Sequence, residues 1–425
     1  MKIGSILLAM TIFVSAVFTA VAQSAVKNQN DGNLSLSEPT LEQKIGQMIL
    51  VGFVGTHENY PWFKQVKRQV ATGKVTGILY LKRNAGSREN ILKINSSILG
   101  AGARHAPLIA VDQEGGKIER LTPRNGFPHT PSAQQISSKL SVREAYEAYL
   151  QMAENLDAWG FNLNLGPVVD LNINKSNPII GRLGRSYSDD PAIVAQYAAA
   201  FVDAHRKFNI LTALKHFPGH GSSLRDSHRG AVDVSKTWRS VEQQPYEELI
   251  ASKHADIIMS AHVRNMQLQA NNERVPVSLS KTGLSDVLRG QLNYSGVIMS
   301  DDLQMDAIKQ HHSLRDAVIK AVNAGNDILI FANDKNPDIN IPAKVTGHLL
   351  REANRSEAFK AAIDRSYKRI VQLKSGLNPS LTKIDGTKTE SISMAANASR
   401  PTLTPELVLS AHRDFPLFLV SKDAE

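Results

Sequence analysis

Short apolar runs rich in β-branched residues alternate with longer amphipathic stretches between Leu41 and about Lys374. A strand, a helix and a second parallel strand form one right-handed unit, so repeated alternation predicts a parallel sheet covered by helices. Eight such runs occur, and eight is the strand number of a (β/α)8 barrel. The candidate strands are Met48–Phe53, Gly77–Leu81, Leu108–Asp112, Phe161–Leu165, Leu211–Lys215, Asp256–Ser260, Val297–Asp301 and Asp327–Phe331.

The intervening stretches have helical periodicity. They predict helices over Arg88–Leu99, Val142–Trp159, Pro191–Phe208, Val241–Lys253, Lys281–Gln291, Leu314–Ala324 and Glu357–Leu373. We therefore expect an α/β fold, a TIM-like (β/α)8 barrel that forms a single catalytic domain over residues 41–375. A doubly wound open sheet is the alternative, but no GxGxxG follows the first strand, which argues against a dinucleotide-binding version.

The two ends of the chain differ from the barrel region. Residues 1–22 have a positive Lys2, the apolar run Ile6–Val21 and a small-x-small pattern ending at Ala22, which together predict a secretory signal peptide. Ala25 offers a second cleavage position. An uncleaved membrane anchor is disfavoured because the apolar run is short. We expect an exported protein, periplasmic or secreted, with a polar lead-in over residues 23–40 and a polar linker or tail over 376–425.

Composition excludes several classes of function. The chain has no cysteine, so disulfides and thiolate chemistry are excluded. It has 49 basic and 40 acidic residues, a net charge of +9, but no basic run interleaved with aromatics that would indicate a nucleic-acid partner. No segment after the signal peptide is apolar enough to span a bilayer. We expect a monomer without a cofactor, whose charge suits anionic polymers.

The densest group of titratable residues lies in Leu214–Gly221 and the following Asp226–His228. These segments place a Lys, an Asp and three His on a stretch that Pro218 and Gly219 keep out of regular structure, just after a β-prone run. Because loops after barrel strands carry catalytic residues, this stretch predicts a site. Polar residues at or just beyond the other strand ends would join it at one rim: Asp112, Asp170, Lys215, His216, His262, Asp301 and Asp302.

Two further segments carry guanidinium groups close to glycines. Arg120 follows the acidic Val111–Gly116, and Arg185 lies in the glycine-rich Asn177–Arg185. Such arginines suit bidentate hydrogen bonds to hydroxyls or carboxylates. Of the paired Asp301 and Asp302, strand alternation does not decide which faces the barrel mouth.

Six motifs occur in a fixed order along the chain: VDQEGG at 111–116, GRLGRSY at 181–187, LKHFPGHG at 214–221, DSH at 226–228, SAHV at 260–263 and SDDLQM at 300–305. In this set the chain resembles the glycoside hydrolase family 3 β-N-acetylhexosaminidases, in the single-domain β-N-acetylglucosaminidase branch. The resemblance covers about Leu41 to Lys374. KHFPGHG followed by DSH is the part specific to that branch.

The resemblance implies a role for each matching residue. Asp301 would be the catalytic nucleophile, His228 the general acid/base and Asp226 its dyad partner. The implied reaction is exo-acting, retaining hydrolysis of terminal non-reducing β-linked N-acetylglucosamine from peptidoglycan fragments or chitooligosaccharides, through a covalent glycosyl-enzyme. The residues that would bind the sugar are Asp112, Arg120, Arg185, Lys215, His216 and His262.

Other functions remain open at this point. A histidine acid/base would tolerate an anionic acceptor, so β-N-acetylglucosaminide phosphorolysis is an alternative, as is another family 3 β-glycosidase activity. His216 and His220 are spaced as ligands of a metal-dependent barrel hydrolase would be, but Pro218 and Gly219 disfavour the helix that this spacing needs. A non-catalytic sugar-binding protein is the last alternative.

The glycines of the central loop suggest movement. Gly219, Gly221 and Ser222–Ser223 predict a flexible loop that closes over bound sugar and only then brings His228 to it.

Overall fold

The computed structural model describes residues 38–269 and 274–377. The predicted signal peptide, most of the polar lead-in and all but the first two residues of the polar tail lie outside these ranges.

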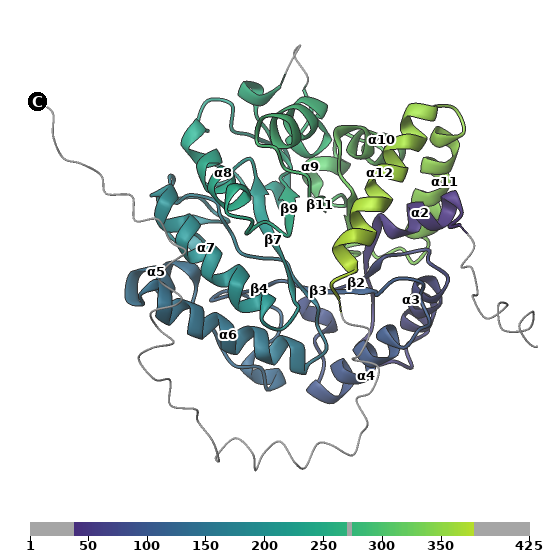
Figure 1. The fold of residues 1–425 in the computed structure, drawn as a ribbon, viewed down its shortest axis with the longest axis horizontal. Coiled ribbons are helices and arrows are strands. Elements are labelled where there is room, and N and C mark those ends of the chain that lie inside the picture. The colour runs from purple at the N-terminus through teal and green to yellow at the C-terminus, as the bar shows by residue number, and fades with distance from the viewer. Residues whose placement is uncertain (1–37, 270–273, 378–425) are drawn as a thin grey trace, which may run out of the picture.

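Eight parallel strands close into a barrel, which confirms the predicted (β/α)8 architecture and excludes the open sheet (Figure 1). Their order around the barrel is β1, β2, β3, β6, β7, β9, β11 and β12, and β12 pairs with β1 to close it. The strands are β1 Ile49–Gly52, β2 Gly77–Tyr80, β3 Leu108–Val111, β6 Leu163–Asn164, β7 Leu211–Phe217, β9 Ile257–Ser260, β11 Val297–Asp302 and β12 Ile328–Phe331.

Helices surround the barrel and separate its strands in the chain (Figure 1). They are α2 Leu41–Gln47, α3 Pro61–Ala71, α4 Arg88–Leu99, α5 Ala133–Lys139, α6 Val142–Ala158, α7 Pro191–Arg206, α8 Gln244–Ala251, α9 Asp306–Lys309, α10 Leu314–Ala324, α11 Ile341–Ala353 and α12 Glu357–Lys374. The predicted helix over Lys281–Gln291 is present as a π-helical segment, Thr282–Gln291.

Short elements decorate the carboxyl end of the barrel. β4 (Gln113–Gly115) and β5 (Ile118–Glu119) form an antiparallel hairpin directly after β3. β8 (Val232–Asp233) and β10 (Val263–Arg264) pair in parallel beyond β7 and β9. A 3-10 turn, η4 (Ser227–Arg229), lies between β7 and β8 and contains His228. These insertions build up the rim that the strand ends leave open.

The core explains why the strands were visible in the sequence. β1, β2, β3, β9 and β12 are buried at every position, because one face fills the barrel and the other packs on helices. The first and last helices of the described ranges, α2 and α12, lie side by side (Figure 1), and Lys44 Nζ bonds Asp364 Oδ1 across them at 2.6 Å. In the described ranges, every helix is too short or too polar to cross a bilayer.

Candidate active site

A cavity of about 220 Å³ opens at the carboxyl end of the barrel. It collects seven of the nine residues predicted for the site, which come from different strands and loops: Asp112, Arg120, Arg185, Lys215, His216, His228 and Asp301. The other two, Asp226 and His262, do not line the cavity but hydrogen bond to residues at its wall. Asp302, which was expected at the same rim, also lines it, as do Glu114 and Asp334, which were not predicted as site residues.

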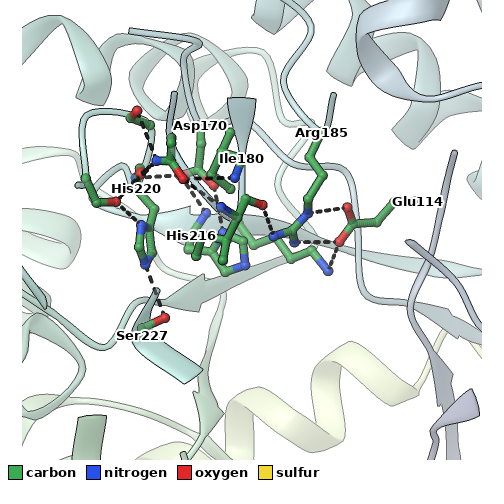
Figure 2. Close-up of polar contacts among 12 residues, drawn as sticks. Glu114, Asp170, Ile180, Arg185, His216, His220 and Ser227 are labelled. Carbon is green, nitrogen blue, oxygen red and sulfur yellow. Dashed lines mark hydrogen bonds and ion pairs between the residues drawn. The ribbon is translucent and has the colours of Figure 1, made fainter. Parts of the chain in front are cut away.

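A chain of ion pairs forms one side of the cavity. Lys215 Nζ lies 2.8 Å from Asp112 Oδ1 and 2.7 Å from Glu114 Oε1. Arg120 binds the other oxygen of Asp112 at 3.0 Å. Arg185 bonds both oxygens of Glu114, with its Nε and one Nη each at 2.8 Å (Figure 2). Three cations and two carboxylates therefore hold one another in fixed positions.

These contacts settle the charge states of both carboxylates. Burial alone would raise the pKa of Asp112, but the charges of Lys215 and Arg120 outweigh it and hold that pKa well below its usual range. In the same way, Arg185 and Lys215 overcome burial and lower the pKa of Glu114 to about 2. Both groups are ionised at neutral pH, so the wall presents fixed charges to a ligand.

Glu114 is the clearest residue missed from the sequence. Its side chain is 7% exposed and is the only contact by which the described structure joins Lys215 to Arg185. The signal was present in the VDQEGG motif, where Glu114 lies two residues beyond Asp112. Strand β4 carries Glu114 back over the cavity as part of the hairpin, which the sequence did not predict.

Lys215 lies in β7, as predicted, and so does His216, because that strand continues to Phe217. This corrects the prediction that the strand ends at Lys215 and that the stretch after it lacks regular structure. Asp170, which is fully buried, accepts the backbone N–H of His216 at 3.1 Å and bonds its ring Nδ1 at 2.7 Å (Figure 2). Lys215 also pairs with Val168 in an isolated bridge. Carboxylates on neighbouring segments thus let two polar residues extend a buried strand.

The loop from Pro218 to Ser223 is tethered on several sides, contrary to the flexibility predicted from its glycines. Asn177 Nδ2 donates to the backbone oxygens of His220 and Gly221 at 2.7 and 3.1 Å. Trp238 donates to the oxygen of Pro218 at 3.0 Å, and Asp170 accepts from the N–H of His220 at 2.7 Å.

Close approach explains the two glycines of this loop. A Cβ on Gly221 would lie 1.7 Å from the backbone oxygen of Leu171. Gly219 has φ +124°, and a Cβ there would lie 2.8 Å from the Cβ of Glu242. Only glycine fits either position, so these residues allow packing rather than movement.

The segment beyond Ser223 carries the acid/base dyad. Asp226 Oδ1 accepts both the backbone N–H and the ring Nδ1–H of His228, each at 2.8 Å. Although partial burial raises the pKa of Asp226, these bonds and the charge of His228 bring it below its ordinary value. The carboxylate therefore fixes the ring, and Nε2 is the nitrogen that can exchange a proton with a ligand.

Asp301 and Asp302 end β11 and are both buried, yet their environments differ. Burial raises the pKa of Asp301, but the charges of His262, His216 and His228 outweigh it, so the net pKa lies below the ordinary value. Burial and the neighbouring Asp301 raise the pKa of Asp302 to about 6, although its side chain accepts the N–H groups of Ala332 and Gln304. Asp301 is thus the more acidic member of the pair, and its oxygens accept fewer backbone hydrogen bonds.

His262 supports this strand end. Its Nε2 bonds the backbone oxygen of Asp302 at 3.0 Å, and its Nδ1 bonds Ser278 Oγ at 2.7 Å. Burial lowers the pKa of His262 despite the opposing charge of Asp301. It therefore holds the backbone next to the two carboxyl groups rather than contacting the cavity itself.

The His216–His220 spacing does not create a metal site among the described residues, where no group of three ligating side chains converges. The ring of His220 is engaged by Ser223 and Ser227, and Nδ1 of His216 by Asp170 (Figure 2). Burial lowers the pKa of His220 to about 4. This histidine is part of the loop's packing.

Comparisons with known proteins agree with the sequence motifs. The family model described as "Glycosyl hydrolase family 3 N terminal domain" matches residues 40–373. A relative named beta-hexosaminidase from Xanthomonas oryzae pv. oryzae is 34% identical over 297 residues, which cover 67% of this chain and 84% of the relative. Another of the same name, from Haemophilus influenzae, is 35% identical over 268 residues, or 61% and 73% of the two chains.

Solved structures show the same architecture. A family 3 β-N-acetylglucosaminidase from Paenibacillus sp. superposes with a TM-score of 0.73 at 28% identity, over 87% of this chain; this chain spans only 65% of that enzyme's length. A β-N-acetylhexosaminidase from Beutenbergia cavernae gives a TM-score of 0.70 at 25% identity, over 80% of this chain and 99% of its own. With the family model matching most of its length, this chain belongs to glycosyl hydrolase family 3, as its motifs predicted.

Proposed function

We propose that this family 3 enzyme is an exo-acting, retaining β-N-acetylhexosaminidase. Its substrates would be glycans that end in β-linked N-acetylglucosamine, such as peptidoglycan fragments or chitooligosaccharides. The observation that carries the proposal is that Asp301 and His228 line one small cavity together with the network of Asp112, Lys215 and Arg120. The names of the relatives, β-hexosaminidase and β-N-acetylglucosaminidase, support the choice of sugar.

The charge states support Asp301 as the nucleophile. A carboxylate that attacks the anomeric carbon must be ionised and rigidly placed. The pKa of Asp301 lies below its ordinary value, and the residue is fixed at the end of a barrel strand, where its Oδ1 accepts the N–H of Asp302 at 2.7 Å. The raised pKa of Asp302 makes that neighbour the poorer candidate. Paired carboxyl groups with diverging pKa values are typical of acid–base sites.

The dyad supports His228 as the acid/base. A histidine needs little adjustment to exchange protons near neutral pH. In the first half-reaction Asp301 would form an ester with the anomeric carbon while Nε2 of His228 gives its proton to the departing glycosidic oxygen. In the second, Nε2 would take a proton from water, whose oxygen displaces Asp301 from the anomeric carbon. Asp226 stays ionised and stabilises the charged imidazole.

The ionic network supports binding of a single terminal sugar. Asp112, Arg120 and Lys215 reach the cavity with their positions fixed by one another, so they can bind sugar hydroxyls without first being ordered. The small volume of the cavity suits one ring rather than a polymer segment, which is the basis for the exo-acting assignment.

The first test compares release of p-nitrophenol from β-N-acetylglucosaminide, β-glucoside and β-xyloside, with and without phosphate. We expect the N-acetylglucosaminide to be preferred and water to be the acceptor. Asp301→Asn should lower kcat at least a thousandfold. His228→Ala should lower kcat/KM much less on this activated substrate than on N,N′-diacetylchitobiose, because nitrophenolate needs little protonation. Preference for the glucoside, or formation of a sugar phosphate, would overturn the assignment.

We also propose export, because the N-terminal segment has the features of a signal peptide. Expression of the full chain in a bacterial host, with separation of cell fractions and N-terminal sequencing, tests this. The mature protein should begin at Gln23 or Val26. An intact N-terminus in the cytosolic fraction would contradict it.

A further inference from the structure

The segment that carries the dyad has few attachments to the barrel. Between Leu224 and Gly230, Asp226 and His228 bond each other, and Leu224 is 71% exposed. Within the described ranges, two side chains from outside bond this segment. His220 reaches Ser227 Oγ at 3.2 Å from the tethered loop, and Lys335 Nζ reaches the backbone oxygen of His228 at 3.5 Å. The position of the acid/base therefore depends on a small number of contacts.

Lys335 joins the segment that carries the dyad to helix α9. It lies in the loop after β12, and its ammonium also pairs with Asp306 Oδ2 on α9 at 3.3 Å. α9 packs against η4, the turn that contains His228. His228, Asp302, Asp334 and Lys335 line one small cavity of about 60 Å³ beside the larger one. Lys335 thus connects the His228 segment to α9 and to the cavity that Asp302, the neighbour of Asp301, also lines.

We propose that Lys335 is a positioning residue, which holds the His228 segment over the cavity through the backbone oxygen of His228. Asp226 orients the ring of His228, whereas Lys335 bonds the backbone oxygen of the same residue. Both polar contacts of Lys335 are long and its side chain is 62% exposed, so the overall fold does not depend on them. Their effect would fall on the placement of the proton donor, because misplacement by about 1 Å weakens catalysis strongly.

This inference rests on the proposed role of His228 and is tested by the dependence on the leaving group. Lys335→Met keeps the aliphatic stem and removes both polar contacts. We expect kcat/KM for N,N′-diacetylchitobiose to fall about tenfold, since that leaving group needs a proton, while kcat/KM for 2,4-dinitrophenyl β-N-acetylglucosaminide is unchanged. General structural damage would lower both values together. Lys335→Arg should restore most of the chitobiose activity.

Lys309 provides a matched control. It lines the same small cavity and carries the same charge, and no hydrogen bond joins it to the His228 segment in the described structure. Lys309→Met should leave both kcat/KM values within about twofold. An equal selective loss in Lys309→Met would show that positive charge, and not the contact with His228, is responsible, and would overturn the proposal.

The outcome separates this inference from the proposed function. If His228→Ala shows the leaving-group effect but Lys335→Met has wild-type kcat/KM on both substrates, only the positioning role fails. If His228→Ala itself shows no difference between the two substrates, the acid/base assignment fails, and the positioning role fails with it.

Discussion

Glu242 is a buried carboxyl group beneath the loop that leads to the dyad. It accepts the N–H of Ser222 at 3.2 Å and that of Arg239 at 3.3 Å, and it packs against Gly219. Burial raises its pKa to about 7, despite the hydrogen bonds that lower it. The ionised form of Glu242 is therefore less stable in the folded protein than in water.

This shift gives stability a defined pH dependence. Because the pKa of folded Glu242, about 7, lies above the ordinary glutamate value of 4.5, the folded state binds the proton more tightly than the unfolded state does. The contribution of protonated Glu242 to the free energy of unfolding is fully present below pH 4.5. It is lost as pH rises through 7, and the loss is about 3 kcal/mol at most. Between pH 5 and pH 8, the free energy of unfolding of Glu242→Gln, measured with urea, should change by about 2.5 kcal/mol less than that of the wild type.

Glu247→Gln is the control for this prediction, because Glu247 is exposed on α8 close by. It should leave the pH dependence of unfolding unchanged. If Glu242→Gln kept the pH dependence of the wild type, Glu242 would not be the group that titrates.

Among individual residues, the sequence predicted most of those in the site but not all of the residues that they contact. Asp112, Lys215, His228 and Asp301 stood out because polar residues follow apolar strands, and motifs gave them roles. Glu114 was missed because its contact with Lys215 depends on the β4–β5 hairpin folding back. The family resemblance chose Asp301 over Asp302, whereas alternation along the strand could not, because it does not contain the hydrogen bonds and charges that distinguish them.

At the scale of elements, all eight strands were predicted because parallel barrel strands are buried on both faces and remain continuously apolar. The strand Leu211–Phe217 was predicted two residues too short, since it was ended at Lys215 and His216 looked like a loop residue before Pro218. Five helices were not predicted: α2 and α5 have only seven residues and α9 has four, while α3 and α11 begin at or next to prolines. The tethers of the Pro218–Ser223 loop come from distant segments, which is why its glycines suggested flexibility.

That loop gives a prediction for packing. In Gly221→Ala the new methyl group would meet the backbone oxygen of Leu171, which cannot move without disturbing Asp170. We expect a loss of about 3 kcal/mol or more in the free energy of unfolding, measured by urea denaturation. Gly376→Ala, where a Cβ would meet nothing within 4 Å, should change it by less than about 0.5 kcal/mol. A wild-type free energy of unfolding in Gly221→Ala would mean that the loop can shift to accommodate the methyl group at little energetic cost.

At the scale of the whole molecule, barrel closure assembles the site. Asp112 follows β3, Lys215 and His216 end β7, and Asp301 ends β11, so that no two of these strands are adjacent in sequence. Pairing of β12 with β1 completes the ring that brings their carboxyl ends to one rim. The order of motifs in the chain predicted this rim once eight strands were recognised, whereas the distances within it required the closed structure.

The proposed mechanism requires Asp301 to form a covalent bond with the sugar. The reagent 5-fluoro-N-acetylglucosaminyl fluoride should trap the covalent glycosyl-enzyme, because the fluorinated sugar is released slowly from the enzyme. Peptide mass spectrometry then locates the label. We predict one sugar per chain, attached to Asp301 in the peptide that contains Val297–Met305, and none in Asp301→Asn. A label on Asp302 would contradict this mechanism. Wild-type turnover of p-nitrophenyl β-N-acetylglucosaminide by Asp301→Asn would contradict it as well.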